Sequence, residues 1–302
     1  MTSACRLLAF IFALIVPLAA VAQEADKAGR SSSQNLLLCA GQDEMFVIDA
    51  DAAEQGAGEK LWSWKAANLP DATPELIKQF NNLDECRAIR GGTQILLTAS
   101  NGGCALIDRS TSKMLWKGYA TNAHSIELLP NNRVVVASSV NGNRLILFDL
   151  AKSDAPQFQT PLHSAHGVIW DESRKLLWAI GFDQLQTYEL VDWESDKPSL
   201  RLVDQYELPT EGGHDLRAVP NSADLILSTH EHVYLFDRNE KKFRLHPEAA
   251  DLEHVKAADV NPETGRLLIG FWKSEMRFFS PAGAITFPAN KPYKIRWLAE
   301  AK

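Results

Sequence analysis

Cysteine is scarce in this chain, and the few cysteines form no framework. Of four cysteines, Cys5 lies in the N-terminal segment, which leaves Cys39, Cys86 and Cys104. Three cysteines cannot all pair, and their spacing fits no metal-binding motif. One disulfide is possible, but Cys39 and Cys104 lie in or beside apolar runs, where an unpaired cysteine packs as a small hydrophobic residue. A fold stapled by several disulfides is excluded.

Clustered positive charge and catalytic motifs are missing as well. The formal net charge is −7 and no basic run occurs, so nucleic-acid binding, which depends on neutralising phosphates, is disfavoured. There is no Gly-x-Ser-x-Gly elbow, no phosphate-cradling glycine-rich loop and no His-Glu-x-x-His. The sequence therefore identifies no catalytic residue, and we expect no cofactor.

The N-terminal segment has the features of a signal peptide. Arg6 precedes an uncharged apolar run over residues 7–21, which ends in Ala20-Val21-Ala22. This run is too short for a membrane span, which needs about 20 apolar residues. We therefore predict a signal peptide over residues 1–22, a flexible polar leader over 23–34, and a secreted or periplasmic mature protein. Loss of Arg6 would change the net charge from −7 to −8.

Residues 35–302 show an all-β pattern with an internal repeat. Only residues 73–80 suggest a helix; elsewhere short apolar runs alternate with Gly, Asn, Asp and Pro. Six runs end in an acidic or small polar residue, at 45–49, 105–108, 145–149, 185–189, 233–237 and 276–280. Each follows a second apolar run, and most are preceded by an amphipathic strand that ends in a turn such as Leu129-Pro130-Asn131-Asn132.

A repeat of about 40 to 50 residues with about four strands is typical of propeller blades. We therefore predict one six-bladed β-propeller domain over residues 35–302. Residues 293–298 look like a first strand without a blade, and the blade beginning at Leu36 lacks one. Pairing of the N-terminal and C-terminal strands would close the ring and leave no open sheet edge there.

Two segments carry a motif. Asp49 with Lys60-Leu61-Trp62, and the stretch from Asp108 to Trp116, resemble the D-x-x-T-G-K-x-x-W pattern of WD40-like and quinoprotein-type (PQQ-like) propeller repeats. The first has an insertion around residues 55–58, and the second has Ser112 in place of Gly. The chain resembles bacterial secreted propellers without an assigned activity. Quinone-dependent relatives usually have eight blades, so the resemblance implies the fold and no quinone.

In such a propeller the first residues of the innermost strands surround one mouth of the central channel. We expect these strand starts to contribute Asp84, Glu85, Arg87, His124, His166, His214, Asp215, His254, Lys256, Tyr293 and Lys294. Turns on the same face would add Asp183, His230, His232, Trp272 and Lys273, together with several amides. Trp62, Trp64, Trp116, Trp170, Trp178 and Trp297 should instead fill the wedges between blades, which leaves Trp272 as an exposed aromatic anchor.

The recurring histidines allow two interpretations. They could hydrogen-bond the neighbouring blade and hold it in place, as repeat proteins reuse one contact in each unit. They could instead converge on the axis to hold a divalent metal or an anionic ligand. Counted from the Pro-Asn turns, His124 and His214 coincide, whereas His166 falls one residue later and His254 about two earlier. This slippage weakens a symmetric metal site, so no metal is expected.

Two functions follow from this face. The first is a monomeric, exported and non-catalytic module that binds a carbohydrate or a protein. The second is a polysaccharide lyase or hydrolase that uses axial His, Arg, Lys and Tyr side chains as base and cation. The predicted ligand-binding residues are His124, His166, His214, Arg87, Lys256, Tyr293, Asp183, His230, His232, Trp272 and Lys273.

Overall fold

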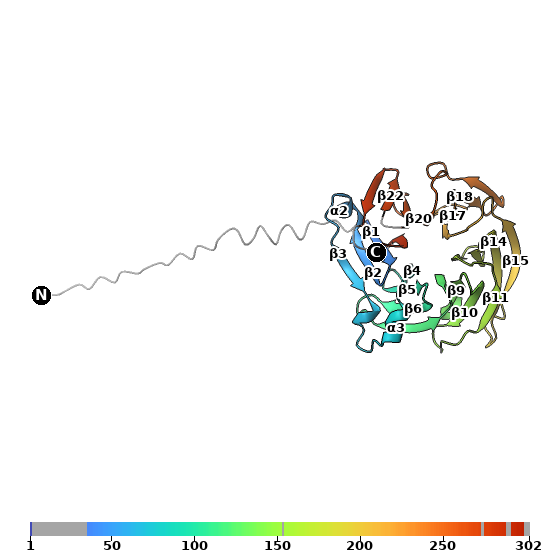
Figure 1. Ribbon diagram of the computed structural model, residues 1–302, viewed down its shortest axis with the longest axis horizontal. Helices are drawn as coiled ribbons and strands as arrows, with labels where there is room; N and C mark the ends of the chain where they lie inside the picture. Colours follow the sequence, from blue (N-terminus) through green and yellow to red (C-terminus); the bar gives the residue numbers. More distant parts are fainter. Residues whose placement is uncertain (2–34, 153, 273–274, 288–290, 299–302) are drawn as a thin grey trace. The chain divides into compact units, whose positions relative to one another are not determined.

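The chain folds into a ring of six four-stranded antiparallel sheets, as the repeat predicts. The computed structural model describes residues 1, 35–152, 154–272, 275–287 and 291–298. Figure 1 shows the sheets as blades around a common axis, with the innermost strand of each blade nearest the centre. The proposed signal peptide and leader, from residue 2 to residue 34, and Lys273 lie outside the described residues.

Each blade runs from its innermost to its outermost strand. Blade one consists of β24 (Lys294–Trp297), β1 (Leu36–Gly41), β2 (Glu44–Asp49) and β3 (Lys60–Trp64). Blade two consists of β4 (Leu83–Ile89), β5 (Gln94–Ala99), β6 (Gly103–Asp108) and β7 (Met114–Tyr119). Blade three consists of β8 (Ala123–Leu129), β9 (Arg133–Ser138), β10 (Arg144–Asp149) and β11 (Phe158–Pro161). Blade four consists of β12 (Gly167–Asp171), β13 (Leu176–Ile180), β14 (Gln184–Val191) and β15 (Ser199–Glu207). Blade five consists of β16 (Asp215–Ala218), β17 (Asp224–Ser228), β18 (Val233–Asp237) and β19 (Lys242–Leu245). Blade six consists of β20 (Val255–Val260), β21 (Leu267–Phe271), β22 (Glu275–Phe279) and β23 (Gly283–Thr286).

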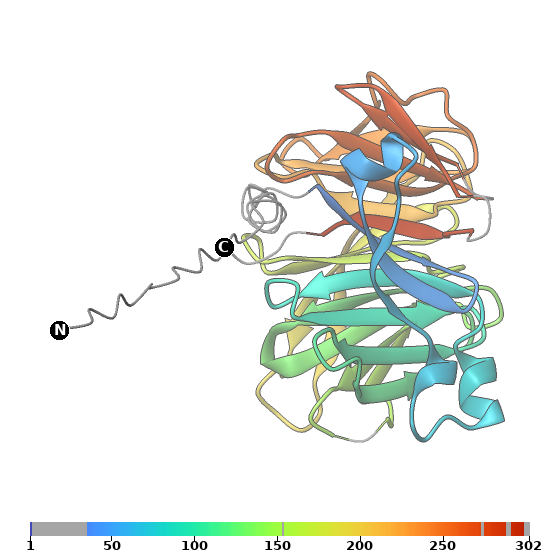
Figure 2. The same cartoon turned by 90° about the vertical axis from the view of Figure 1, so that its left-hand side faces the viewer.

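The ring is closed by its two ends, which confirms the predicted pairing. β24 lies antiparallel to β1, with Leu37 opposite Trp297 and Ala40 opposite Lys294. Figure 2 shows the blue N-terminal strand and the red C-terminal strand in this blade. The amide of Tyr293 adds one more bond to the carbonyl of Ala40 at 2.7 Å. Blade one is therefore assembled from opposite ends of the chain, and its sheet is complete only when both ends are in place.

Apolar wedges between neighbouring blades form the core. Six clusters of buried residues join consecutive blades, from the contact of blades one and two round to the contact of blades six and one. The predicted tryptophans lie in or against these clusters: Trp62 and Trp64, Trp116, Trp170, Trp178 and Trp297. Trp272 is the exception, with 62% of its surface exposed. The interior is thus consistent with the pattern of large flat side chains in the sequence.

Local signals set the turns and the short helices. The predicted helix appears as α3 (Pro74–Gln79), with proline at its start and the Thr73 hydroxyl accepting from the amide of Leu76. The Pro-Asn turns hold Asn131 and Asn221 at φ of 58° and 55°, a region that asparagine tolerates. Ser112 adopts φ of 56° where the resembled motif has glycine.

Three further short helices lie in the connections that the structure describes. α2 (Ala50–Glu54) occupies the insertion after β2 and is capped by Asp49, and the 3₁₀ turns are η1 (Ala66–Asn68) and η2 (Pro130–Asn132). No helix within the described residues is long and apolar enough to cross a membrane. Cys39, Cys86 and Cys104 are all unpaired and buried, as small core residues would be.

Candidate functional site

Each of the six inner strands has a polar residue, in the strand or directly before it, that lines a single cavity at one mouth of the channel. This cavity has a volume of about 510 Å³. In blade order, the axial residues that line it are Tyr293, Asp84, His124, His166, His214 and Lys256. We call these six residues the axial ring. Gln42, Asn82, Leu83, Ser100, Trp272 and Lys291 complete the wall.

Breaks in strand pairing bring three of these residues to the axis. The register between first and second strands shifts between Leu83 and Cys86, between Ala123 and Ser125, and between Val255 and Ala257. The residues left unpaired include Asp84, His124 and Lys256. A bulge of this kind bends a strand and redirects a side chain, and bulges are common beside functional sites.

In blades four and five the histidines reach the same level without a bulge. His166 and His214 stand one residue before β12 and β16. Their amides continue the ladder by donating to the carbonyls of Ile180 at 2.9 Å and Ser228 at 2.8 Å. The one-residue slippage seen in the sequence is thereby absorbed, and the three imidazoles come together.

The imidazoles form a contiguous row. The ring centroids of His124 and His166 are 4.4 Å apart, and those of His166 and His214 are 4.8 Å apart. Burial lowers the pKa of His166 to about 4 and takes the pKa values of His124 and His214 well below 6.5, helped by nearby cationic groups. All three rings are therefore neutral near pH 7.

Neutral rings fix which nitrogen carries the proton. The Lys256 ammonium lies 2.6 Å from Nε2 of His214 and donates to it, so the His214 proton is on Nδ1. That Nδ1 is buried and has no hydrogen-bond partner among the described residues. His166 donates its Nδ1–H to the carbonyl of Ser164 at 2.7 Å, which leaves its Nε2 as an acceptor. His214 therefore has a buried Nδ1–H donor that no described residue accepts.

Burial shifts the pKa values of two residues of the axial ring, Lys256 and Asp84, in opposite directions. Burial lowers the pKa of Lys256 to about 8, with a contribution from the Lys294 charge. Burial raises the pKa of Asp84 to about 8, although Ser100 donates to its Oδ2 at 2.6 Å. At pH 7 Lys256 is therefore mostly charged and Asp84 is mostly neutral. Among the residues that the structure describes, Asp84 is the only acidic one that lines the cavity.

An ion network separates this cavity from the other end of the channel. Arg296 donates to both carboxylate oxygens of Glu85 at 2.9 and 3.0 Å, and to both oxygens of Asp215 at 2.7 Å. Lys294 donates to Asp215 at 2.7 Å. These four side chains are 1–2% exposed. They come from β24, β4 and β16, so they link the closing strand to blades two and five.

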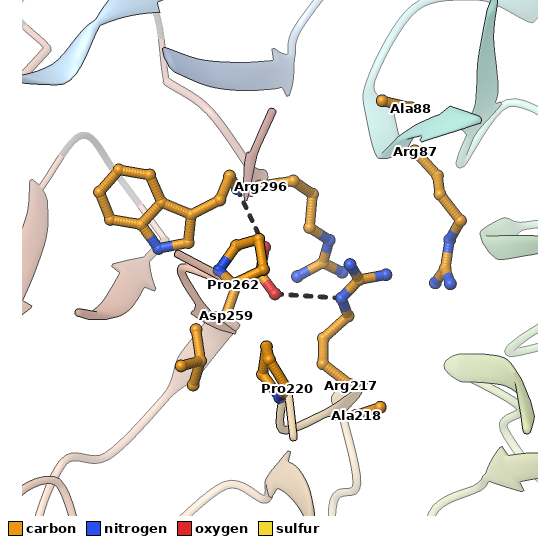
Figure 3. A pocket seen from close by; sticks show the side chains of 10 residues that line it. Arg87, Ala88, Arg217, Ala218, Pro220, Asp259, Pro262 and Arg296 are labelled. Carbon is orange, nitrogen blue, oxygen red and sulfur yellow. Dashed lines mark hydrogen bonds and ion pairs between the residues drawn. The ribbon is translucent and has the colours of Figure 1, made fainter. Parts of the chain in front are cut away.

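The opposite mouth has a different composition. Arg87, Arg217, Arg296 and Asp259 line a second cavity of about 170 Å³, shown in Figure 3. Arg87 was expected among the histidines, but the structure places it here. It pairs with Glu127 and donates to the carbonyl of Val168. Its place follows from the strand rise of about 3.3 Å per residue, which moves it some three steps along β4 from Asp84.

The predicted turn residues divide into two groups. Trp272 lines the histidine cavity, and its ring lies 5.9 Å from the Lys256 ammonium. His230 packs against His214 with ring centroids 4.9 Å apart, but it is exposed and does not line the cavity. His232 donates its Nδ1–H to the carbonyl of Ala250 and is directed elsewhere. Asp183 does not line the cavity, and neither does His254, which was expected at a strand start.

Sequence reasoning missed Asn82 and Lys291 in the same wall. Asn82 lies two residues before Asp84, and Lys291 lies two residues before Tyr293, so extending the strand-start comparison by two residues would have found them. It also missed Arg217 and Asp259 at the opposite mouth. In the sequence each of them follows an oppositely charged residue of the same inner strand: Arg217 follows Asp215 in β16, and Asp259 follows Lys256 in β20. This pattern was the available signal.

Metal binding finds no support among the residues that the structure describes, where no group of three His, Cys, Asp or Glu side chains is arranged to hold an ion. The physical reason lies at His214. Its Nε2 lone pair, which a metal would need, already accepts a hydrogen bond from the Lys256 ammonium. A cation at this position would also be repelled by Lys256.

Comparison with known proteins gives a family without a function. Residues 3–300 match the model of a family described as a family of unknown function, DUF6528. No curated protein matches the sequence.

Proposed function

Because the chain belongs to the DUF6528 family, whose function is not known, we propose from its own geometry that it binds an acidic carbohydrate. The ligand would enter the cavity of the axial ring and place a carboxylate against Lys256 and His214. The protein would act as an exported, non-catalytic binding module of the WD40-like or PQQ-like propeller type. The turn made by Asp108, whose Oδ1 accepts from Thr111, supports that kinship.

The charge of the cavity supports an anionic ligand. Lys256 is 6% exposed, and its hydrogen bond goes to a neutral imidazole rather than to a carboxylate. Lys291 adds a second ammonium to the wall. Asp84, with a pKa of about 8, offers little opposing charge at neutral pH. A buried ammonium with no counter-ion is unfavourable, so an incoming carboxylate would satisfy it.

Donors and shape point to a sugar. The cavity volume of about 510 Å³ lies within the usual range of small-molecule sites, about 300–1,000 Å³. Trp272 presents an exposed aromatic face beside the Lys256 ammonium, and such a ring can stack on the apolar face of a sugar. Gln42, Asn82 and Ser100 offer amide and hydroxyl groups to sugar hydroxyls.

Binding fits the histidines better than lyase or hydrolase chemistry. A general base works best when its pKa is near the operating pH. The pKa of His166 is about 4, and His124 and His214 are also well below 6.5 because they are buried. Tyr293 has a pKa well above 10 for the same reason. At neutral pH the three imidazoles are therefore weak bases and the Tyr293 phenol stays protonated, so these groups act as hydrogen-bond donors and acceptors.

The experiment is calorimetric titration of the protein from Gln23 onward with tri-galacturonate and with neutral galacto-trisaccharide. We expect heat only from the acidic sugar. Lys256→Met should weaken it about tenfold to a hundredfold, as loss of a charge-assisted bond implies. Lys117→Met removes an exposed charge from β7 and should change nothing. Equal binding of both sugars, or full binding by Lys256→Met, would contradict the proposal.

A further inference from the structure

The arginine-lined mouth holds guanidinium groups whose donors are not all used. Arg217 donates its Nε to Asp259 Oδ1 at 3.2 Å. No described residue accepts a hydrogen bond from its two terminal nitrogens, and its side chain is 23% exposed. Arg87 uses both terminal nitrogens, but its buried Nε has no hydrogen-bond partner in the described parts of the chain.

The carboxylates at this mouth are already occupied. Oδ2 of Asp259 accepts from the amide of Trp297 at 2.9 Å, while Oδ1 accepts from Arg217. Glu127, which pairs with Arg87, does not line the cavity, nor do the two carboxylates that hold Arg296. Asp259 therefore pairs with the Nε side of the Arg217 guanidinium, and the two terminal nitrogens remain for the cavity that Arg217 lines.

The residues that line the cavity carry more positive than negative charge, because the carboxylates that pair with Arg87 and Arg296 do not line it. Three arginines and one aspartate line it, although the whole chain has a formal net charge of −7. Figure 3 shows the guanidinium groups of Arg217 and Arg296 facing each other. Glu85 and Asp215 already pair with Arg296, so an anion in this cavity would bind chiefly to the terminal nitrogens of Arg217.

The volume limits what can enter. About 170 Å³ is far more than the roughly 15 Å³ that a single water needs, but it is below the range of about 300–1,000 Å³ typical of larger ligands. Pro220 and Pro262 stand in the wall and have no amide N–H to donate. The guanidinium groups therefore supply the charged recognition.

We infer that this mouth is a binding site for a small oxyanion, the size of inorganic phosphate or of a short carboxylate. The terminal nitrogens of Arg217 bind it in the forked geometry that suits planar and tetrahedral oxyanions. The site is separate from the sugar cavity, because Glu85, Asp215, Lys294 and Arg296 lie between the two. It does not depend on the proposed carbohydrate function.

The test is calorimetric titration of the chain from Gln23 onward with inorganic phosphate and, separately, with acetate, against sodium chloride at equal ionic strength. All titrations use the Lys256→Met background, so that the ammonium of the other cavity does not contribute. Arg217→Gln should weaken binding about tenfold or more, and Arg217→Lys should restore only part of it. Arg244→Gln is the matched control, since Arg244 also lies in blade five and pairs with one carboxylate, Asp224.

Urea unfolding of Arg217→Gln checks that the variant is folded, as its partial exposure leads us to expect. Binding of phosphate or acetate that Arg217→Gln reduces and Arg244→Gln preserves supports the inference, and the stronger of the two anions defines the class. Absence of binding by both anions would overturn it. So would binding that Arg217→Gln leaves unchanged. None of these outcomes depends on whether the other mouth binds tri-galacturonate.

Discussion

The two mouths of the channel are built from the same six inner strands, yet they differ in how charge is balanced. At the histidine mouth a cavity of about 510 Å³ holds neutral imidazoles and the Lys256 ammonium, which has no carboxylate partner in the described part of the chain. At the arginine mouth a cavity of about 170 Å³ is lined by guanidiniums that each pair with at least one carboxylate. Buried ions between the mouths satisfy one another.

The difference shows that register, and not composition alone, decides where a ligand can act. The inner strands carry both signs of charge along their length, and pairing across the axis neutralises most of it. At the histidine mouth the bulges at Asp84, His124 and Lys256 remove these residues from the regular ladder. Lys256 then faces imidazoles instead of a carboxylate, and the cavity is left with unsatisfied donors.

The largest expected effect comes from breaking the ion network between the mouths. Arg296→Met should lower the free energy of unfolding by about 3–5 kcal/mol, because Glu85 and Asp215 would lose a buried partner. Closure of blade one would weaken at the same time, since Arg296 lies in β24. Urea unfolding followed by tryptophan fluorescence measures the change.

The control for this variant is Arg201→Met, which removes an exposed ion pair with Glu189 on blade four. Exposed pairs contribute little to stability, so its unfolding curve should overlay that of the wild type. A small loss of unfolding free energy in Arg296→Met would show that the buried ion network between the mouths contributes little to stability.

The second effect is acid sensitivity that arises from His166 at the histidine mouth. The pKa of His166 is about 4 in the folded protein, against an ordinary 6.5. Its stabilising contribution is complete above pH 6.5 and is lost as the pH falls from 6.5 to about 4, because the unfolded chain binds the proton first. His166→Gln should therefore lose about 3 kcal/mol less stability than the wild type between pH 7 and pH 4.

Urea unfolding at each pH gives this difference. His163→Gln, which replaces an exposed histidine in the same blade connection, should keep the acid sensitivity of the wild type. If His166→Gln were as acid-sensitive as the wild type, the axial imidazoles would not be neutral through burial.

The sequence was sufficient for the ring and insufficient for its register. Blade number, the pairing of Leu36–Gly41 with the C-terminal strand, and the tryptophan wedges follow from local patterns that each repeat carries by itself. The row of three imidazoles does not, because a bulge at His124 shifts that strand by one residue. Arg87 was assigned to the wrong end of its strand, since residues near Asp84 in sequence are separated along the axis.

The third effect is a difference between the two mouths in how ligand binding depends on pH. Binding of tri-galacturonate should weaken about tenfold per pH unit above pH 8, as Lys256 loses its proton and Asp84, with a pKa also of about 8, becomes charged. Phosphate binding at the other mouth should persist, because a guanidinium keeps its charge through this range. Titrations at pH 7, 8 and 9 measure both, and parallel loss of the two ligands would mean that one site binds them.

The smallest effect concerns Trp272, which belongs to the histidine mouth but not to its core. Trp272→Ala should weaken tri-galacturonate binding by about 1 kcal/mol, the order expected for loss of one aromatic contact. Its 62% exposure predicts an unchanged unfolding free energy, and phosphate binding near Arg217 should be unaffected. Trp272→Phe keeps a ring and should recover most of the affinity. If the alanine variant bound the sugar as well as the wild type, the stacking face would be dispensable and the ligand would be held by Lys256 and His214 alone.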